Sequence, residues 1–149
     1  MNVLMNKVLT HKFLLILGIC SLVIFSYKVD AASFAQAIGG RGALDGQLFE
    51  AAKNNDVILA RNLLKDGAKV NYKDFFSENK TALIMASLYD HKEMVEMLLK
   101  VEGIDVNAAD KDGETALIWA SRFSRKKVIE MLLNVEGIDV NAADKDGET

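Results

Sequence analysis

"VEGIDVNAADKDGET" occurs at Val101–Thr115 and again, unchanged, at Val135–Thr149, and this repetition decides the fold. A fixed period of about 34 residues is the signature of a repeat architecture, in which each unit packs on its neighbours. Working outward from the two copies, three segments align from end to end: Leu48–Asn71, Leu83–Asn107 and Leu117–Asn141. The chain is therefore expected to form a stack of similar units.

Each unit is expected to contain two short helices. In the second unit, apolar side chains recur at helical spacing over Thr81–Leu88 and again over Lys92–Lys100. Thr81 is suited to cap the first helix, and Asp90, between the two, tolerates left-handed backbone geometry. Helices this short are not stable alone, so stacking must supply the core. The expected units cover about residues 47–74, 81–110 and 115–144, with the start of a fourth at 144–149.

This pattern resembles the ankyrin repeat. The resemblance is carried in the third unit by Asp110, Asp112-Gly113, Thr115-Ala116-Leu117, Ala120, Val128, Leu132-Leu133, Gly137 and Val140-Asn141. It implies an all-α solenoid of stacked helix-turn-helix units, joined by β-hairpin-like fingers, that recognises another protein and is not an enzyme. The chain departs from the family's T-P-L-H, which reads TALI at Thr81–Ile84, and its first finger, Tyr72–Lys80, is two residues longer than the next.

The second copy of the repeated stretch stops where another helix should begin. We expect from this that the sequence is a piece of a longer protein, and that the C-terminal face lacks the polar capping unit that keeps solenoids soluble. Such a face would be open to self-association. An alternative is that the repeats are the N-terminal targeting arm of a larger secreted effector whose catalytic domain lies beyond residue 149.

Residues 1–31 have the features of a signal peptide. A basic start precedes the uncharged run Phe13–Phe25, and small residues follow, which places the expected cleavage between Ala31 and Ala32. The run is shorter than the roughly 20 residues of a membrane span, although an uncleaved anchor and a lipoprotein at Cys20 remain alternatives. We expect a secreted or periplasmic protein, in contact with a membrane only if the signal is not cut.

Cleavage would change the charge of the chain and its cysteine content. It removes three lysines and one aspartate, which takes the net charge from −3 to −5, and it removes the only cysteine. The remaining chain cannot form an internal disulfide, and its acidity disfavours nucleic-acid binding. Residues 32–46 read as a flexible, glycine-rich lead-in that matches no phosphate-binding loop, so no nucleotide or other cofactor is expected.

Few side chains in the sequence suit catalysis or metal binding. His91 is the only histidine left after cleavage, and its place between paired helices favours a structural role. The acidic group Asp110, Asp112 and Glu114 lacks the spacing of a calcium loop and reads as turn chemistry. The basic stretch Arg122–Lys127 is either a solvated turn or a surface for an acidic partner.

Partner-contact positions are carried over from the ankyrin resemblance, at the fingers and the first helix of each pair. They are Phe75, Phe76, Glu78, Lys80, Leu88, Tyr89, Lys111, Asp112, Glu114, Arg122 and Phe123. Several are aromatic or large and apolar, as is typical of interaction sites. The alternative for Phe75 and Phe76 is local packing over the long finger. Trp119 is expected in the core.

Overall fold

The computed structural model describes residues 43–149. The predicted signal peptide, its cleavage site at Ala31–Ala32 and residues 32–42 of the predicted lead-in lie outside the described residues. None of the helices in the described range has the length and hydropathy that a membrane span requires.

Six α-helices in three pairs make up the array, with a short 3-10 turn in the first finger. They are α3 (Leu44–Lys53), α4 (Val57–Lys65), η1 (Phe75–Ser77), α5 (Ala82–Leu88), α6 (Lys92–Leu99), α7 (Ala116–Arg122) and α8 (Lys126–Leu133). Within residues 43–149 there is no β-strand, and isolated antiparallel bridges, Asp74 with Lys80 and Ala109 with Thr115, close the first two fingers. The predicted all-α solenoid with hairpin-like fingers is confirmed.

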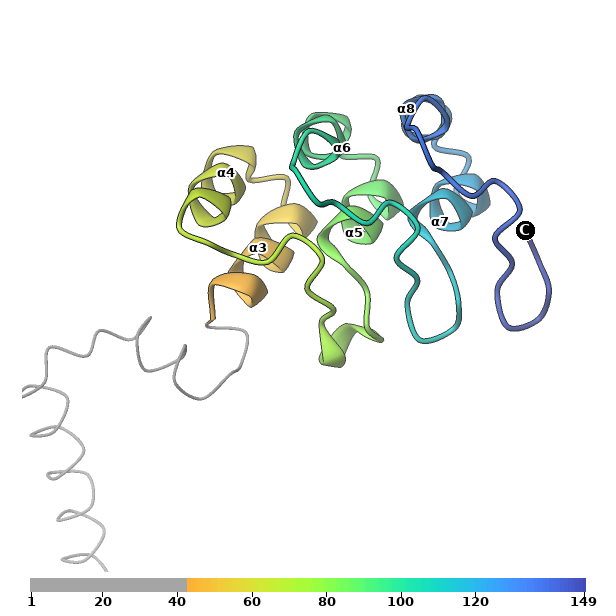
Figure 1. Cartoon of the computed structure of the whole chain (residues 1–149), viewed down its shortest axis with the longest axis horizontal. Helices are drawn as coiled ribbons and strands as arrows, with labels where there is room; N and C mark the ends of the chain where they lie inside the picture. Colours follow the sequence, from red (N-terminus) through yellow and green to blue (C-terminus); the bar gives the residue numbers. More distant parts are fainter. Residues whose placement is uncertain (1–42) are drawn as a thin grey trace, which may run out of the picture.

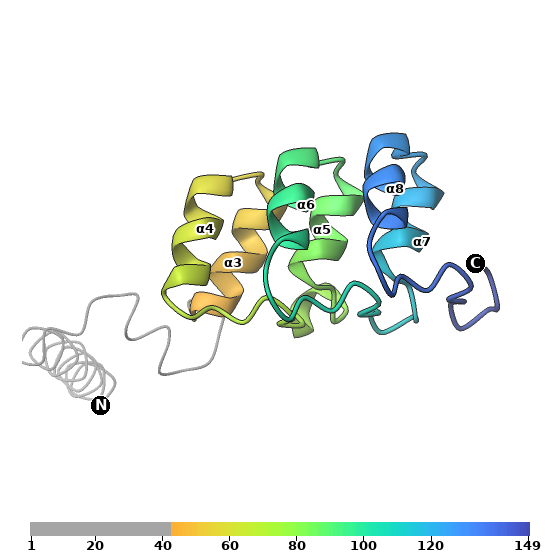
Figure 2. The same ribbon diagram turned by 45° about the horizontal axis from the view of Figure 1, so that its top comes forward.

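The helices form two layers. The first helices of the pairs, α3, α5 and α7, lie in one row and α4, α6 and α8 lie in the other, while the fingers extend beyond the first row (Figure 1). Turning the molecule shows the two helices of each pair lying side by side (Figure 2). Each unit therefore presents one helix and one finger on the same side of the stack.

Equivalent positions fill the core in every unit. Ala51, Ala86 and Ala120 are buried at the same place in the three first helices, where a small side chain lets neighbouring helices approach. Leucines occupy the buried position of the second helices at residues 63, 98 and 132. Full burial of one leucine contributes about 1.5–3 kcal/mol, which it can do only because the next unit covers it.

The predicted caps and turns are present. Thr81 Oγ1 accepts a hydrogen bond from Ile84 N–H at 3.3 Å, so Thr81 caps α5 as predicted. The turn between the paired helices has left-handed geometry in each unit, with φ of 58° at Asn55, 60° at Asp90 and 53° at Ser124. Asn and Asp adopt this geometry more readily than Ser, so the third turn is the most strained of the three.

Asparagine side chains tie each unit to the next. Asn71 Nδ2–H donates to Gly103 O at 2.8 Å, and its Oδ1 accepts from Asp105 N–H at 2.9 Å. Asn107 repeats both bonds one unit further on, with Gly137 O at 2.8 Å and Asp139 N–H at 2.9 Å. These two pairs set the spacing of successive loops.

Helix α3 begins at Leu44, three residues before the end of the predicted lead-in, residues 32–46. Residues 44–46 belong to α3, and Gly46 is buried. The start of this helix is held in place because Asp45 Oδ1 accepts a hydrogen bond from Lys69 N–H at 2.7 Å. Lys69 lies in the loop after α4, so this contact joins residues 24 positions apart and is invisible to local periodicity.

The extra length of the first finger forms η1. The turn continues through Glu78 and Asn79, which both have left-handed φ values of 60° and 62°. The second finger instead makes its turn at Gly113, where φ is 84°. The longer finger therefore carries Phe75 and Phe76 at its tip.

Candidate protein-binding surface

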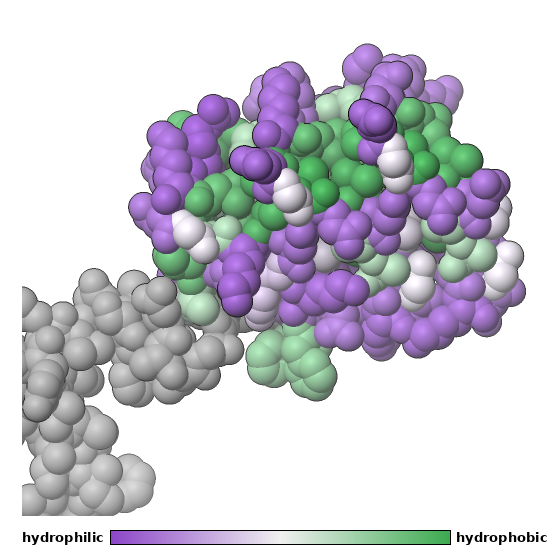
Figure 3. Space-filling model, in the orientation of Figure 1, coloured by the Kyte–Doolittle hydropathy of each residue, from purple (hydrophilic) through white to green (hydrophobic). Residues whose placement is uncertain are grey.

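The tip of the first finger exposes two aromatic rings. Phe75 is 80% and Phe76 74% exposed, and their rings meet edge to face with centroids 5.9 Å apart. Figure 3 shows a hydrophobic projection below a hydrophilic lower edge, at the place of η1 in Figure 1. The rings contact each other but remain largely in solvent, which disfavours the local-packing alternative.

A second pair of aromatic residues lies at the ends of the first helices. Tyr89 and Phe123 are the C-cap residues of α5 and α7, and both are a little under half exposed. Tyr89 stacks on His91 with ring centroids 5.8 Å apart, and the guanidinium of Arg125 lies 5.7 Å from the Phe123 ring. Each exposed ring is therefore supported by the residue two positions later.

The charged residues of the first finger pair with the second finger. Glu78 accepts hydrogen bonds from Lys111 Nζ at 2.6 Å and from Lys80 Nζ at 2.8 Å. The hydrogen bonds from Lys111 and then Lys80 lower the pKa of Glu78 from 4.5 to about 2. Glu78 is thus ionised across the ordinary pH range and holds two lysines.

Asp110 organises the second finger. Its Oδ1 accepts from the backbone N–H groups of Asp112 and Glu114, both at 3.0 Å, and its Oδ2 accepts from Trp119 Nε1–H at 3.0 Å. Lys80 Nζ lies 3.5 Å from the same Oδ2 and 4.7 Å from the centre of the Trp119 ring. One buried carboxylate therefore joins two fingers to α7. The prediction assigned Asp110 to a turn but missed this wider role, although the repeated D-x-D-G-E pattern is a signal for it.

Arg122 connects the second finger to the third. Its guanidinium pairs with Glu114, with Asp144 at 3.4 Å and with Glu148 at 3.9 Å. It also lies 5.4 Å from the centre of the Trp119 ring. The charges on this side of the molecule therefore bind largely to each other, and they lock the fingers in register.

Burial separates the predicted contact residues into two groups. Lys80 and Glu114 were predicted to lie at the surface, but each is only 7% exposed. Both serve as internal ion-pair partners. Leu88 is half-buried, and its carbonyl accepts from Arg125 Nε–H at 3.1 Å. Lys111 and Asp112 are about half exposed at their side chains but take part in ion pairs, Asp112 with Lys145 at 3.4 Å.

Trp119 lies between the predicted core and the surface. It packs against the hydrophobic core but is only half-buried, and its ring stacks on Phe123 with centroids 5.9 Å apart. The expectation of a core tryptophan is thus met in part. Its indole N–H bonds to Asp110, so the residue also joins the finger network.

His91 has a structural contact, in line with its predicted role. Its Nε2–H donates to Lys53 O at 3.0 Å, and Arg125, at the equivalent place in the next unit, donates to Leu88 O. Both residues therefore fasten one unit to the carbonyl of the unit before it. Across residues 43–149, no group of three or more His, Cys, Asp or Glu is arranged to hold a metal ion.

Comparison with known proteins identifies the architecture. The family model described as ankyrin repeats, in three copies, matches residues 48–144. No curated protein matches the chain. The family match begins within α3 and covers the other five helices and the first two fingers.

Proposed function

The chain belongs to the ankyrin-repeat family, whose repeats are generally protein–protein interaction modules, and we propose that it captures a protein partner on its fingers and first helices. The observation that carries this proposal is the exposure of Phe75, Phe76, Tyr89 and Phe123 on a side where the charged groups pair among themselves. Solvent-exposed aromatic rings on a rigid support are typical anchors of an interface.

The ion pairs at the base of the first finger favour a binding surface that is already formed before the partner binds. Ion pairs hold Glu78, Lys80 and Lys111 together, so the base of the first finger keeps its position relative to the second. An aromatic anchor held in one place loses little conformational entropy on binding. We infer that the partner contacts apolar tips whose spacing is set by the internal ion pairs.

The test is capture of a partner from the native source, followed by affinity measurements with variants of the full chain. Phe76→Ala and Phe123→Ala should each weaken binding by about tenfold or more, the range of an interface hot spot. Their thermal midpoints should stay within a few degrees of the parent, because both rings are exposed. Unchanged affinity, or unfolding of the variants, would refute this surface.

We also propose that the protein is exported, on the strength of the basic start, apolar run and small residues of the sequence up to Ala32. The intact mass of the native protein tests this proposal. A mass that matches a chain starting at Ala32 supports cleavage. A chain that retains Met1 and is recovered in the membrane fraction favours the anchored alternative.

Self-association through the end face of the third unit is a further proposal. Leu133 and Val140 are about half exposed there, whereas Val106, the equivalent of Val140 in the second unit, is buried. Sedimentation velocity of the parent and of Leu133→Lys distinguishes the outcomes. A monomer at all concentrations would refute the proposal.

A further inference from the structure

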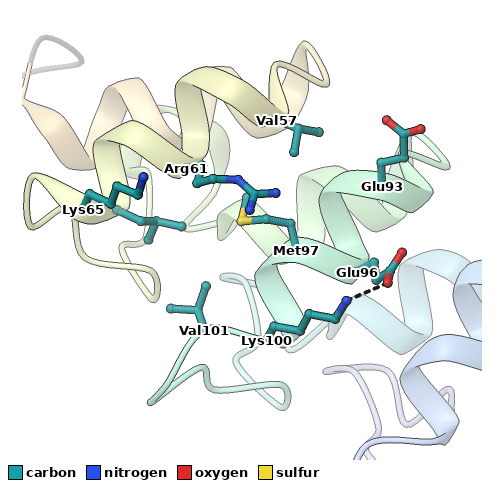
Figure 4. A pocket seen from close by; sticks show the side chains of 9 residues that line it. Val57, Arg61, Lys65, Glu93, Glu96, Met97, Lys100 and Val101 are labelled. Atoms are coloured by element: carbon teal, nitrogen blue, oxygen red, sulfur yellow. Dashed lines mark hydrogen bonds and ion pairs between the residues drawn. The ribbon is translucent and has the colours of Figure 1, made fainter.

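A groove lies between α4 and α6 (Figure 4). Both helices belong to the layer that does not carry the fingers (Figure 1). Its volume is about 610 Å³, which lies in the range of ligand sites. Four apolar residues line it: Val57, Leu64, Met97 and Val101. Five charged residues complete the lining: Arg61, Lys65, Glu93, Glu96 and Lys100. The groove thus combines an apolar interior with a charged rim.

The sequence of α4 departs from its counterparts at this groove. Where α6 begins with Lys92–Glu93 and α8 with Lys126–Lys127, α4 begins with Val57–Ile58. Ile58 is 78% exposed although it lies on a helix surface that is charged in the other two units. Figure 3 shows hydrophobic surface between the hydrophilic ridges that mark α4 and α6. The first unit therefore begins its second helix with two apolar residues, of which Val57 lines the groove.

Some of the charged residues that line the groove have an ion-pair partner and others do not. Lys100 Nζ donates to Glu96 at 2.7 Å, and this hydrogen bond lowers the pKa of Glu96. In the part of the chain that the structure describes, Arg61 and Lys65 make no ion pair. Figure 4 shows the Arg61 guanidinium reaching across the groove toward Met97. A guanidinium without an ion-pair partner, over an apolar floor, can donate two hydrogen bonds to a carboxylate.

Arg61 also stands where the other units have an acid. The equivalent residues are Glu96 in α6 and Glu130 in α8. Glu96 pairs with Lys100, the C-cap residue of α6, and Glu130 pairs with Lys127 on α8. The first unit thus carries Arg61 and Lys65 one helical turn apart with no acidic partner on α4. The groove has three cations and two carboxylates in its lining, in a chain whose net charge is −3.

We propose that this groove is a second docking site, for an acidic amphipathic segment of a protein partner. Apolar side chains of that segment lie over Val57, Met97 and Val101, and its carboxylates pair with Arg61 and Lys65. A planar guanidinium binds a carboxylate through two parallel hydrogen bonds, which gives both affinity and orientation. The site is independent of the finger surface, because it lies on the opposite layer of helices.

The test uses two fluorescein-labelled peptides and the full chain. Both probes are short amphipathic helices with leucines at helical spacing, one with glutamates and the other with lysines on the polar face. Fluorescence anisotropy should show the glutamate peptide binding at least about tenfold more tightly. Arg61→Glu should remove this preference, and it should fold normally because α6 and α8 carry glutamate at the same position.

Two control variants separate the groove from general effects. Lys127→Glu makes the same change in net charge on α8, away from the groove, and should alter the affinity less than about twofold. Phe76→Ala should leave peptide binding unchanged, so failure of the finger surface and failure of the groove are distinguishable. Loss of binding in Phe76→Ala would place the peptide on the fingers and overturn the proposal.

The remaining outcomes also overturn it. Equal binding of both peptides, or of neither, would show that the groove does not select acidic segments. An Arg61→Glu variant with unchanged affinity would show that the guanidinium is not the anchor. If sedimentation shows that the parent self-associates and Arg61→Glu does not, the occupant is a second copy of this chain.

Discussion

Replacing Asp110 with alanine is expected to open the second finger and to destabilise the array. The carboxylate accepts three hydrogen bonds, each at 3.0 Å, from two backbone N–H groups and the Trp119 indole. It also pairs at 3.5 Å with Lys80, whose side chain is only 9% exposed. The alanine variant would leave all four groups without this acceptor.

The magnitude follows from the burial of the site. A hydrogen bond to a charged group contributes about 1.5–3 kcal/mol net, and bonds to one carboxylate are not additive. Removing one partner of a buried ion pair costs about 3–5 kcal/mol. We therefore expect Asp110→Ala to lower the free energy of unfolding by about 3–5 kcal/mol, and Asp110→Asn, which keeps one acceptor oxygen, by about 2 kcal/mol.

A matched control exists in the third finger. Asp144 accepts from the backbone N–H groups of Asp146 at 3.0 Å and Glu148 at 2.9 Å, as Asp110 does in its own turn. In the described structure no helix packs beyond this finger, so its opening exposes little apolar surface. Asp144 also pairs with Arg122 at 3.4 Å, but that guanidinium is partly exposed and keeps its ion pair with Glu114. Asp144→Ala is therefore expected to cost about 1–2 kcal/mol, less than Asp110→Ala.

Urea unfolding followed by far-UV circular dichroism gives the free energies, and Trp119 fluorescence reports on the finger itself. A loss below about 1 kcal/mol for Asp110→Ala, or a loss no larger than that of Asp144→Ala, would refute the reasoning. The finger would then be held by packing, and the carboxylate network would be incidental.

Three further predictions concern single residues. NMR titration should give Glu78 a pKa near 2, and Lys111→Gln should raise this pKa. Because the folded-state pKa is depressed, the contribution of Glu78 to stability is present above pH 4.5 and is lost as the pH falls toward 2. Ser124→Gly should raise the free energy of unfolding by about 0.5–1 kcal/mol, because relief of left-handed strain exceeds the entropic cost of glycine; a destabilised variant would contradict this. Asn107→Ala should lower the free energy of unfolding in urea by about 1–2 kcal/mol, because it loses two inter-unit hydrogen bonds. Asn141→Ala, at the equivalent position in the third unit, should cost almost nothing, and equal losses would show that these hydrogen bonds are not the cause.

Local chemistry explains why the helices and turns were predictable. The stretch Thr81–Leu88 combines a capping hydroxyl with apolar residues at helical spacing, and the structure places α5 and its cap there. Asp90 was expected to tolerate left-handed geometry and has φ of 60°. The two copies of D-K-D-G-E form the same turn, at Asp110 and at Asp144, because the carboxylate bonds to backbone groups two and four residues later.

Contacts between distant residues explain where the predicted surface was incomplete. Lys80 can be buried because its charge pairs with that of Asp110, thirty positions later in the sequence. Glu114 is buried because Arg122 reaches back from the end of α7 to pair with it. Neither pairing has a periodic signature, so a lysine and a glutamate at the finger positions looked like solvated contact residues.

The sequence by itself determined the repeat period, the two helices of each unit, their caps and the left-handed turns between them, because each of these depends on interactions within a few residues. The tertiary structure decided which side chains reach solvent. Phe75 and Phe76 are exposed and Lys80 is buried, although all three lie in one finger. The difference comes from the neighbouring unit, which supplies Asp110 and Trp119 to the lysine, whereas both rings remain largely in solvent.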